Sequence, residues 1–298
     1  MEKIHYYSVN KYLKDTFGEK VYKLALDGGF TCPNRDGTLD TRGCIFCSGM
    51  GSGEFAERIN NFSDISKQIE LGKQRINAKT GMNCKYIAYF QSFTNTYAPV
   101  ERLRELYMAA ISNPDIVAIS IATRPDCLPD DVLLLLRELN QLKPVWVELG
   151  LQTIHPNTAK YIRRGYELNV YDDAVRKLNS IGISQIITHI ILGLPGETKD
   201  MMLDSVRYVV DSGTGGIKLQ LLHVIKGTDL EKEYIANNFD TLTLEEYVDI
   251  VVSCVDIIPN NVVIHRITGD GDKKTLVSPQ WSANKKLVLN TLNIYIQC

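Results

Sequence analysis

The sequence has no long apolar run, no excess of one charge and no tract of low complexity. No apolar stretch approaches the roughly eighteen residues that span a bilayer, and Met1–Tyr7 lacks the apolar core of a signal peptide. Lysine and arginine total 33 against 35 aspartate and glutamate, so no global basic field indicates a nucleic acid or a membrane surface. We therefore expect a cytoplasmic protein with no membrane partner, whose other partners must be inferred from local features.

The composition is that of an ordinary globular protein. The 298 residues are 44% hydrophobic and 23% charged, which excludes disordered and collagen-like classes and suffices for a buried core. The seven cysteines are odd in number and unevenly spread, which argues against a disulfide framework in a reducing compartment. Metal binding or redox chemistry is therefore the expected use of cysteines that cluster.

Apolar, β-branched runs alternate with segments of helical period, as in repeated βα units around a parallel sheet. The expected strands are Val21–Leu26, Tyr86–Phe90, Ile116–Ala122, Val145–Gly150, Ile186–Leu192 and Ile217–Val224. The expected helices are Ile65–Asn77, Val100–Ser112, Asp130–Gln141, Tyr171–Ser180, Lys199–Asp211 and Leu244–Ile257. These units favour an α/β fold, a partial or complete barrel, although periodicity alone does not separate a barrel from a doubly wound sheet.

No repeat, linker or change in composition divides the chain. We expect one domain over residues 1–298, with a core at about 20–225 and a C-terminal extension at about 226–298. In either architecture the loops that follow the strands face one crevice, so reactive groups are expected there.

A cysteine-rich loop follows the first expected strand. Cys32, Cys44 and Cys47 have the spacing C-x11-C-x2-C in a stretch rich in Gly, Asn and Asp. Soft thiolate ligands select zinc or an iron–sulfur cluster, and a structural zinc would need a fourth ligand, whereas no fourth Cys or His lies nearby. A cluster held by three cysteines, with one open iron, fits better than zinc or than three unrelated buried thiols.

This loop, with Phe46 just before its last cysteine, resembles that of the radical S-adenosylmethionine (SAM) superfamily. Its long first gap is closest to those of Elongator-catalytic-subunit-like members. Further matches follow the later strands in the expected order: Thr123–Asp126, Glu148–Thr153, Arg163–Tyr166 and Gly193–Thr198. The resemblance covers roughly residues 20–225, and Gly51–Ala56 with the tail Val263–Gly271 narrows it to the bacterial YhcC/YtqA branch.

The resemblance implies a TIM-like partial (β/α)6 barrel and two cofactors. Cys32, Cys44 and Cys47 would bind a [4Fe-4S] cluster, whose open iron is chelated by S-adenosyl-L-methionine, the source of a 5′-deoxyadenosyl radical. Most relatives carry a Gly-Gly-Glu type turn after the second strand for the methionine amine. Here that turn is replaced, and Gln91, Ser92 and Thr94 are the expected neutral hydrogen-bonding substitutes.

Further cofactor contacts are expected from the later motifs. Glu148 and Gln152 alternate onto one strand face and could meet ribose hydroxyls or the methionyl group. Arg164 resembles the family's carboxylate-binding arginine, His189 aligns with a ribose-contacting position, and Gly193 shapes a turn whose backbone approaches the adenine. The structural alternatives are a polar surface loop, a helix-end cation and a satisfied core histidine.

The branch resemblance also implies a substrate. Members of the YtqA (MnmL) type convert 5-carboxymethylaminomethyluridine to 5-aminomethyluridine at the tRNA wobble position, whereas YhcC-type relatives have no firmly assigned substrate. The implied partners are tRNA, an electron donor such as flavodoxin or ferredoxin, and a downstream tRNA methyltransferase. The alternatives are a radical SAM enzyme acting on a small molecule and a non-catalytic zinc-stabilised binding module.

Overall fold

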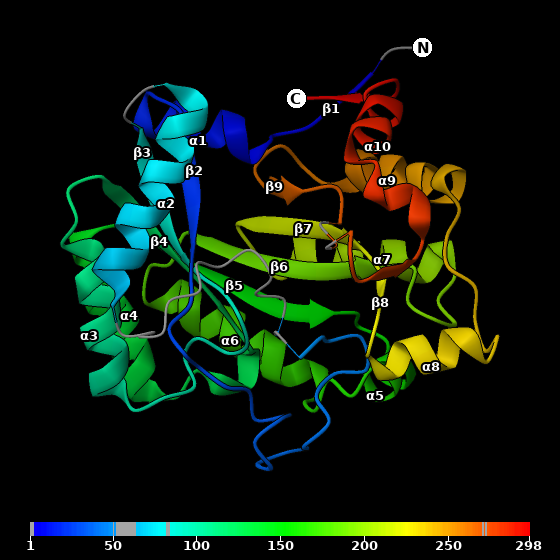
Figure 1. The fold of residues 1–298 in the computed structure, drawn as a ribbon, viewed down its shortest axis with the longest axis horizontal. Helices are drawn as coiled ribbons and strands as arrows, with labels where there is room; N and C mark the ends of the chain where they lie inside the picture. The colour runs from blue at the N-terminus through cyan, green and yellow to red at the C-terminus, as the bar shows by residue number, and fades with distance from the viewer. Residues whose placement is uncertain (1–2, 50, 52–63, 82–83, 270, 272) are drawn as a thin grey trace.

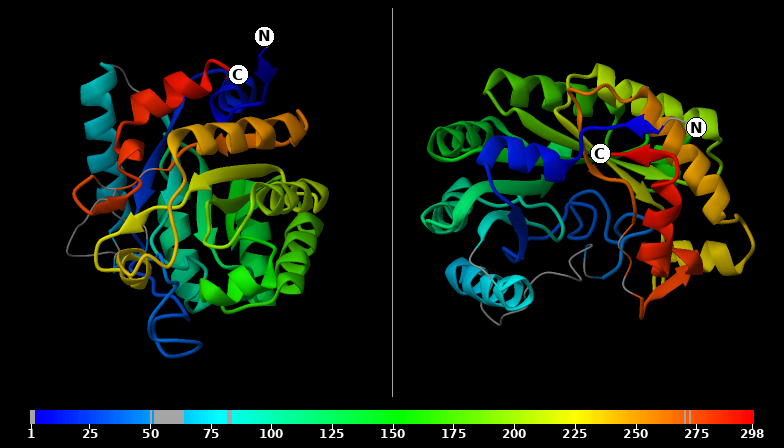
Figure 2. Two further views of the ribbon diagram at one scale, coloured as in Figure 1. Left: turned by 90° about the vertical axis from the view of Figure 1, so that its right-hand side faces the viewer. Right: turned by 90° about the horizontal axis from the view of Figure 1, so that it is seen from above.

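The computed structural model describes residues 3–49, 51, 64–81, 84–269, 271 and 273–298. Its centre is a seven-stranded sheet of order β2-β3-β4-β5-β6-β7-β9, in which every neighbouring pair is parallel. The strands are β2 (Val21–Leu26), β3 (Lys85–Phe90), β4 (Ile116–Thr123), β5 (Val145–Gln152), β6 (Gln185–Leu192), β7 (Gly216–Leu221) and β9 (Val263–Arg266). The sheet curls without closing, so the predicted partial barrel is confirmed (Figure 2).

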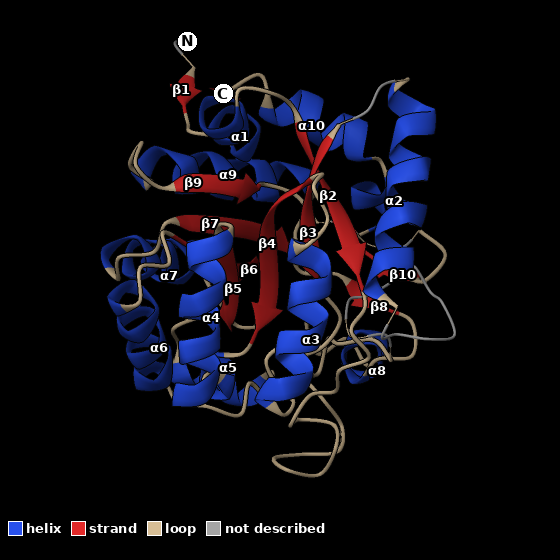
Figure 3. Cartoon of the chain, turned by 90° about the vertical axis from the view of Figure 1, so that its left-hand side faces the viewer, coloured by secondary structure: helices blue, strands red, loops and turns tan. Residues whose placement is uncertain are grey.

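Helices connect successive strands and cover the outer face of the sheet (Figures 2 and 3). They are α2 (Ile65–Thr80), α3 (Val100–Ile111), α4 (Asp130–Leu142), α6 (Leu168–Ser180), α7 (Lys199–Asp211) and α9 (Leu244–Ile257). The shorter helices α5 (Pro156–Tyr161) and α8 (Asp229–Ile235) lie by the cysteine loop, where Tyr161 and Leu230 pack in a small core with Ile45. Lys199–Asp211 and Leu244–Ile257 match the prediction residue for residue. For α9 the reason is local, since Thr243 and Glu246 form a capping box at its first turn. None of the described helices is long and apolar enough to cross a membrane.

The last predicted strand, Ile217–Val224, is wrong at its end. The parallel strand stops at Leu221, and Val224 begins β8 (Val224–Ile225), which pairs antiparallel with β10 (Leu276–Ser278). The strand does not continue past Leu221. The apolar pattern continues because Leu222 and Val224 pack in a small core with Ile45 of the cysteine loop.

The C-terminal extension contributes directly to the barrel. After α9 it supplies β9, a seventh parallel strand beyond the six that periodicity indicated. It continues through α10 (Lys285–Leu292) to β11 (Ile296–Gln297), which pairs in parallel with β1 (Ile4–His5), so the described chain ends lie side by side (Figure 1). Ser52–Ala56 and Asp270, which belong to the motifs that indicated the YhcC/YtqA branch, lie outside the described residues.

The inner face of the sheet is apolar at the end where the strands begin. Leu13 of α1 (Val9–Phe17) packs there against a small core that contains Val21, Ile87, Trp146 and Ile187. Alternate residues of a strand point to the same face. Farther along the strands, the residues on this inner face are polar and charged. Apolar side chains therefore fill the barrel at the end where the strands begin, and polar and charged side chains line it toward the end where the strands finish.

Candidate active site

The cysteine loop is held against the loop that follows β5 by one buried amide. Asn34 is 1% exposed, and its Nδ2 donates to the Arg163 carbonyl at 2.8 Å and lies 3.6 Å from the Sγ of Cys44. A Cβ at Gly165, where φ is +82°, would lie 2.7 Å from Asn34 Oδ1, so only glycine permits this approach. The position of Cys44 thus depends on contacts far apart in sequence.

The loop after β3 also binds the cysteine loop. The Phe93 amide donates to the Gly51 carbonyl at 3.2 Å, and the Thr94 amide donates to the Thr31 carbonyl at 3.1 Å. Ser92 and Phe93 both have positive φ, of 83° and 59°, a conformation that non-glycine residues adopt at an energetic cost. Two consecutive non-glycine residues with positive φ indicate a strained backbone, which is typical of functional sites and not of an ordinary polar surface loop.

These loops and the strand ends enclose a cavity of about 220 Å³. Ten of the eleven predicted site residues line it: Cys32, Cys44, Cys47, Gln91, Ser92, Thr94, Glu148, Gln152, Arg164 and His189. Gly193 is not among its described lining residues. Its φ is +87° and a Cβ there would meet Leu242 at 2.9 Å, so a left-handed turn and close packing account for the glycine.

Two arginines lie at the thiol end of this cavity. Arg164 is 3% exposed and donates to the carbonyls of Thr153 at 2.7 Å and Tyr166 at 3.0 Å, so it is not the solvated helix-end cation of the structural alternative. Arg124 forms a bidentate pair with Asp126, at 2.9 and 2.7 Å. Burial outweighs nearby charges and lowers the pKa of Arg164. Both guanidinium groups lie over the ring of Tyr166.

A buried charged cluster forms the base of the cavity, which we define as Lys23, Ser120, Glu148, His189 and Lys218. Glu148 Oε1 accepts from Lys23 Nζ at 2.9 Å and from Ser120 Oγ at 2.8 Å. Its Oε2 accepts from His189 Nε2 at 2.8 Å and from Lys218 Nζ. Five strands contribute these side chains, so the sheet itself fixes their relative positions.

Charge and burial determine the protonation of this base. Burial opposes ionisation of Glu148, but Lys218, Lys23 and His189 hold its pKa well below the usual range. Burial, followed by the charge of Lys218, lowers the pKa of His189 to about 4, so the imidazole is neutral. Because carboxylate oxygens only accept, His189 Nε2 carries the hydrogen and Nδ1 accepts from Gln220 Nε2 at 3.1 Å. Burial lowers the pKa of Lys218 to about 7, against the opposing effect of Glu148.

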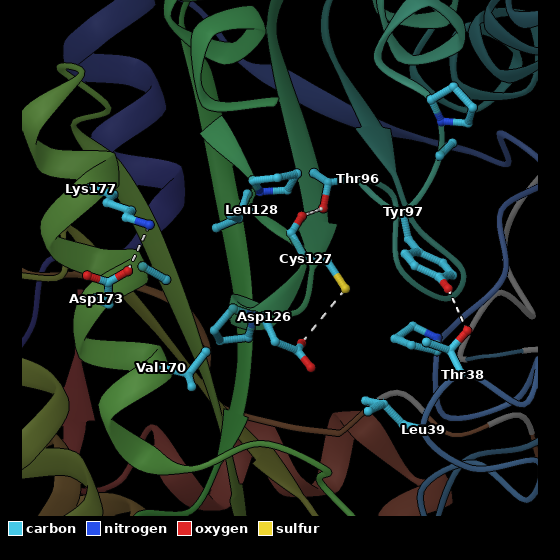
Figure 4. A pocket seen from close by; sticks show the side chains of 16 residues that line it. Thr38, Leu39, Thr96, Tyr97, Asp126, Cys127, Leu128, Val170, Asp173 and Lys177 are labelled. Carbon is cyan, nitrogen blue, oxygen red and sulfur yellow. Dashed lines mark hydrogen bonds and ion pairs between the residues drawn. The ribbon is translucent and has the colours of Figure 1, made fainter. Parts of the chain in front are cut away.

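A second, larger cavity of about 780 Å³ lies beside the cysteine loop (Figure 4). Pro33, Tyr97, Cys127 and residues of α6 line it, and the Cys127 thiol points toward Asp126 Oδ1 at 3.8 Å. Burial, then the charge of Asp126, raises the pKa of Cys127 to about 12. Since Arg124 lines the first cavity and Asp126 the second, their ion pair joins the two cavity walls.

Sequence reasoning did not single out Asn34, Lys23 or Lys218 as site residues. A signal for Lys218 exists, because it and Gln220 alternate with apolar residues in β7, just as Glu148 does in β5. A buried carboxylate requires a partner, and an inward lysine on a nearby strand supplies one. Asn34 carried no such signal, because its contacts depend on how two loops meet.

The donor set at the thiol end fits an iron–sulfur cluster. Three thiols from one loop line one cavity, and thiolate is the usual ligand of such clusters. The neighbouring Thr94 hydroxyl is buried and has no hydrogen-bond partner among the described residues, which leaves a polar atom for a bound molecule. The cavity therefore offers both metal ligands and a polar contact beside them.

Comparison with known proteins agrees with this geometry. The chain is 49% identical to YtqA of Bacillus subtilis over 97% of this chain and 88% of that protein. It is 28% identical to the tRNA uridine(34) acetyltransferase of Methanocaldococcus jannaschii over 52% of this chain and 28% of that protein. The structure of the archaeal Methanocaldococcus infernus Elp3 with an N-terminal deletion shares the fold, with a TM-score of 0.68 at 20% identity, over 92% of this chain and 63% of that one.

The family profiles cover most of the sequence. Residues 214–297 match the Radical_SAM C-terminal domain, which accounts for the extension that completes the sheet. Residues 41–209 match the Radical SAM superfamily. The chain therefore belongs to the radical SAM superfamily, whose enzymes use a [4Fe-4S] cluster and S-adenosylmethionine.

Proposed function

We propose that this radical SAM enzyme modifies the wobble uridine of tRNA, converting 5-carboxymethylaminomethyluridine to 5-aminomethyluridine. The observation that carries the proposal is one cavity in which three thiols lie opposite a charged base, in a chain with tRNA-modifying relatives. Such a cavity can hold a radical source and a polar substrate arm together. Membership in the superfamily argues against the zinc-stabilised binding module, and a radical SAM enzyme acting on a small molecule is the alternative that the test below must separate.

Within this proposal Cys32, Cys44 and Cys47 hold the cluster. When bound, the cluster and S-adenosylmethionine would supply an electron and a 5′-deoxyadenosyl radical, which would take a hydrogen atom from the CH2 group between the amine and the carboxylate of the arm. Loss of one more electron to the oxidised cluster would leave an imine, which water would hydrolyse to the aminomethyl group and glyoxylate, with S-adenosylmethionine converted to methionine and 5′-deoxyadenosine. Asn34 and Gly165 position the loop that carries the thiols.

Several side chains are placed to orient S-adenosylmethionine. The unpartnered Thr94 hydroxyl, with Gln91 and Ser92 beside it in the cavity wall, is suited to the methionine amine. We assign Arg164 to the methionine carboxylate and Gln152 to polar contacts of the nucleoside. Glu148 binds His189 and both lysines, and His189 also binds Gln220, so we assign Glu148 and His189 to the base of the cavity rather than to the ribose.

The proposed RNA contact lies at the cavity mouth. Outside the cavity, Lys73 of α2 and Lys85 of β3 both bind Asp115, at 2.8 and 3.3 Å, so an acidic neighbour compensates the charge of these two lysines. By contrast, four arginines line the cavity; Arg164 is assigned above to the cofactor and Arg124 is paired with Asp126, so Arg35 and Arg266 are the proposed nucleotide contacts. Arginine is suited to phosphate and nucleobase contacts, so the wobble nucleotide would enter here. A flavodoxin- or ferredoxin-type reductant and a methyltransferase acting on the product complete the proposed set of partners.

Nucleoside analysis of tRNA from a deletion strain tests the proposal. The expected result is accumulation of 5-carboxymethylaminomethyluridine and loss of the aminomethyl form, restored by the intact gene but not by a Cys44→Ala variant. Reconstituted protein with dithionite should then convert the isolated tRNA and form 5′-deoxyadenosine. An unchanged nucleoside profile in the deletion strain would refute the assignment of substrate while leaving membership in the superfamily intact.

A further inference from the structure

The base of the cavity carries more positive charge than Glu148 neutralises. Lys23 and Lys218 both bind this carboxylate, and the neutral His189 adds no charge, so the cluster has one net positive charge when Lys218 is in its ammonium form, at and below about neutral pH. Glu148 is the one carboxylate among the described residues that line the cavity, while Lys218 and Arg266 both line it. An excess of positive charge at a buried site is costly unless an anion balances it.

Lys218 also has a hydrogen to donate. Its ammonium group carries three hydrogens, and its partners among the described residues are Glu148 and the Tyr89 hydroxyl at 3.4 Å. The side chain is 5% exposed, and it lies in the wall of the cavity that also contains the three thiols. Lys23 is not among the described lining residues, so it balances Glu148 from outside the cavity and leaves the charge of Lys218 available.

We propose that Lys218, with Arg266 beside it on the neighbouring strand, binds the carboxylate of the substrate's carboxymethylamino arm. The two residues are register partners on β7 and β9, so both can reach one anionic group. This inference rests on the proposed function, which supplies a substrate arm that ends in a carboxylate. Lys218 is then a specificity-determining residue that positions the arm for hydrogen abstraction.

The same charge favours release of the product. The substrate arm carries an ammonium and a carboxylate, with no net charge, whereas the aminomethyl product retains only the ammonium. A cationic base attracts the first arm and repels the second. The preference for substrate over product is therefore the quantity to measure.

The test compares binding of two tRNAs that differ only in the arm, one with the carboxymethylaminomethyl group and one with the aminomethyl group. Phosphate contacts are common to both, so the ratio of their dissociation constants isolates the arm. The proteins are the reconstituted wild type, Lys218→Gln, the double variant Glu148→Gln/Lys218→Gln, and the control Lys232→Gln. Lys232 is 77% exposed and binds Asp229 on the surface of α8. The dissociation constant of S-adenosylmethionine is measured for each protein without tRNA.

We expect the wild type and the control to bind the carboxylate-bearing tRNA about tenfold more tightly, and both Lys218 variants to prefer it by less than about twofold. The double variant is informative because it removes the charge that Lys218 would otherwise leave unpaired. If it recovers the wild-type preference, Lys218 is only a counterion of Glu148, and the inference is overturned.

Other outcomes separate this inference from the proposed function. A wild-type protein that converts the substrate tRNA without preferring it overturns the inference alone. A protein that neither converts nor prefers that tRNA overturns both. If Lys218→Gln weakens S-adenosylmethionine binding but keeps the tRNA preference, the carboxylate bound there is the cofactor's, and the inference is again overturned.

Discussion

The two ends of the cavity are built in different ways. The thiols lie between β2 and α2, on a stretch whose described part contains no helix or strand and is held by turns and a few side chains such as Asn34 and Arg35. The charged base consists of side chains on five strands of one parallel sheet, β2 and β4 to β7. The base is therefore preorganised by the fold, whereas the thiol end depends on individual contacts and on the cofactor that it binds.

The largest expected effect is at the thiol end. Cys44→Ala should reduce the iron content from about four atoms per chain to background and abolish 5′-deoxyadenosine formation, because two cysteines do not retain the cluster. Anaerobic reconstitution, iron analysis and absorption spectra measure this. Cys298→Ala, which alters an exposed cysteine, is the matched control and should keep both properties. Full iron content in Cys44→Ala would show that another group ligates the cluster.

A smaller effect is expected where the thiol end is anchored. Asn34→Ala removes the buried amide that donates to the Arg163 carbonyl and should cost about 1–3 kcal/mol in the free energy of unfolding. The reconstituted variant should also lose iron faster to a chelator, because Cys44 is less well held. Denaturant unfolding and the rate of iron release report the two effects. Asn157→Ala, at an exposed position of α5, should match the wild type in both measurements.

The charged base should make the free energy of unfolding depend on pH. Burial lowers the pKa of Lys218 in the folded protein to about 7 from its ordinary value of 10.5, so between these values the unfolded chain binds more protons and the stability of the wild type rises with pH. The contribution is at most about 1.4 kcal/mol per pH unit. Lys218→Met should lack this rise when urea unfolding is compared at pH 7, 8 and 9. Equal slopes for the two proteins would show that Lys218 remains charged when folded.

The smallest expected effect concerns His189. Since its pKa is about 4, it does not titrate near neutrality, and His189→Gln preserves one donor toward Glu148 and one acceptor toward Gln220. The variant should therefore keep the wild-type shape of the rate profile between pH 6 and 8. A limb near pH 6 that is present in the wild type and absent in the variant would show that His189 is protonated during turnover.

The same contrast explains what the sequence could predict. The strands and outer helices follow from apolar periodicity, and the thiols follow from their spacing, because both signals are local. Lys218 and Lys23 pair with Glu148 across the sheet. Predicting these contacts requires the order and register of the strands as well as the alternation of residues along each strand. β9 was not counted because it is short and follows a helix that sequence reasoning assigned to the extension. Asn34 depends on loop geometry, which periodicity does not describe.

The pairing at the outer edge of β9 has a consequence for solution behaviour. The Ile264 amide donates to the Tyr7 carbonyl at 2.8 Å, and Ser8 forms a bridge with the same residue, so the N-terminal segment occupies part of that strand's free edge. Uncovered strand edges invite pairing with other chains. Removing the first eight residues should therefore cause self-association, detectable by light scattering, before it affects any chemistry at the distant thiols. We therefore expect the segment before α1 to limit aggregation, because it covers part of the edge of β9.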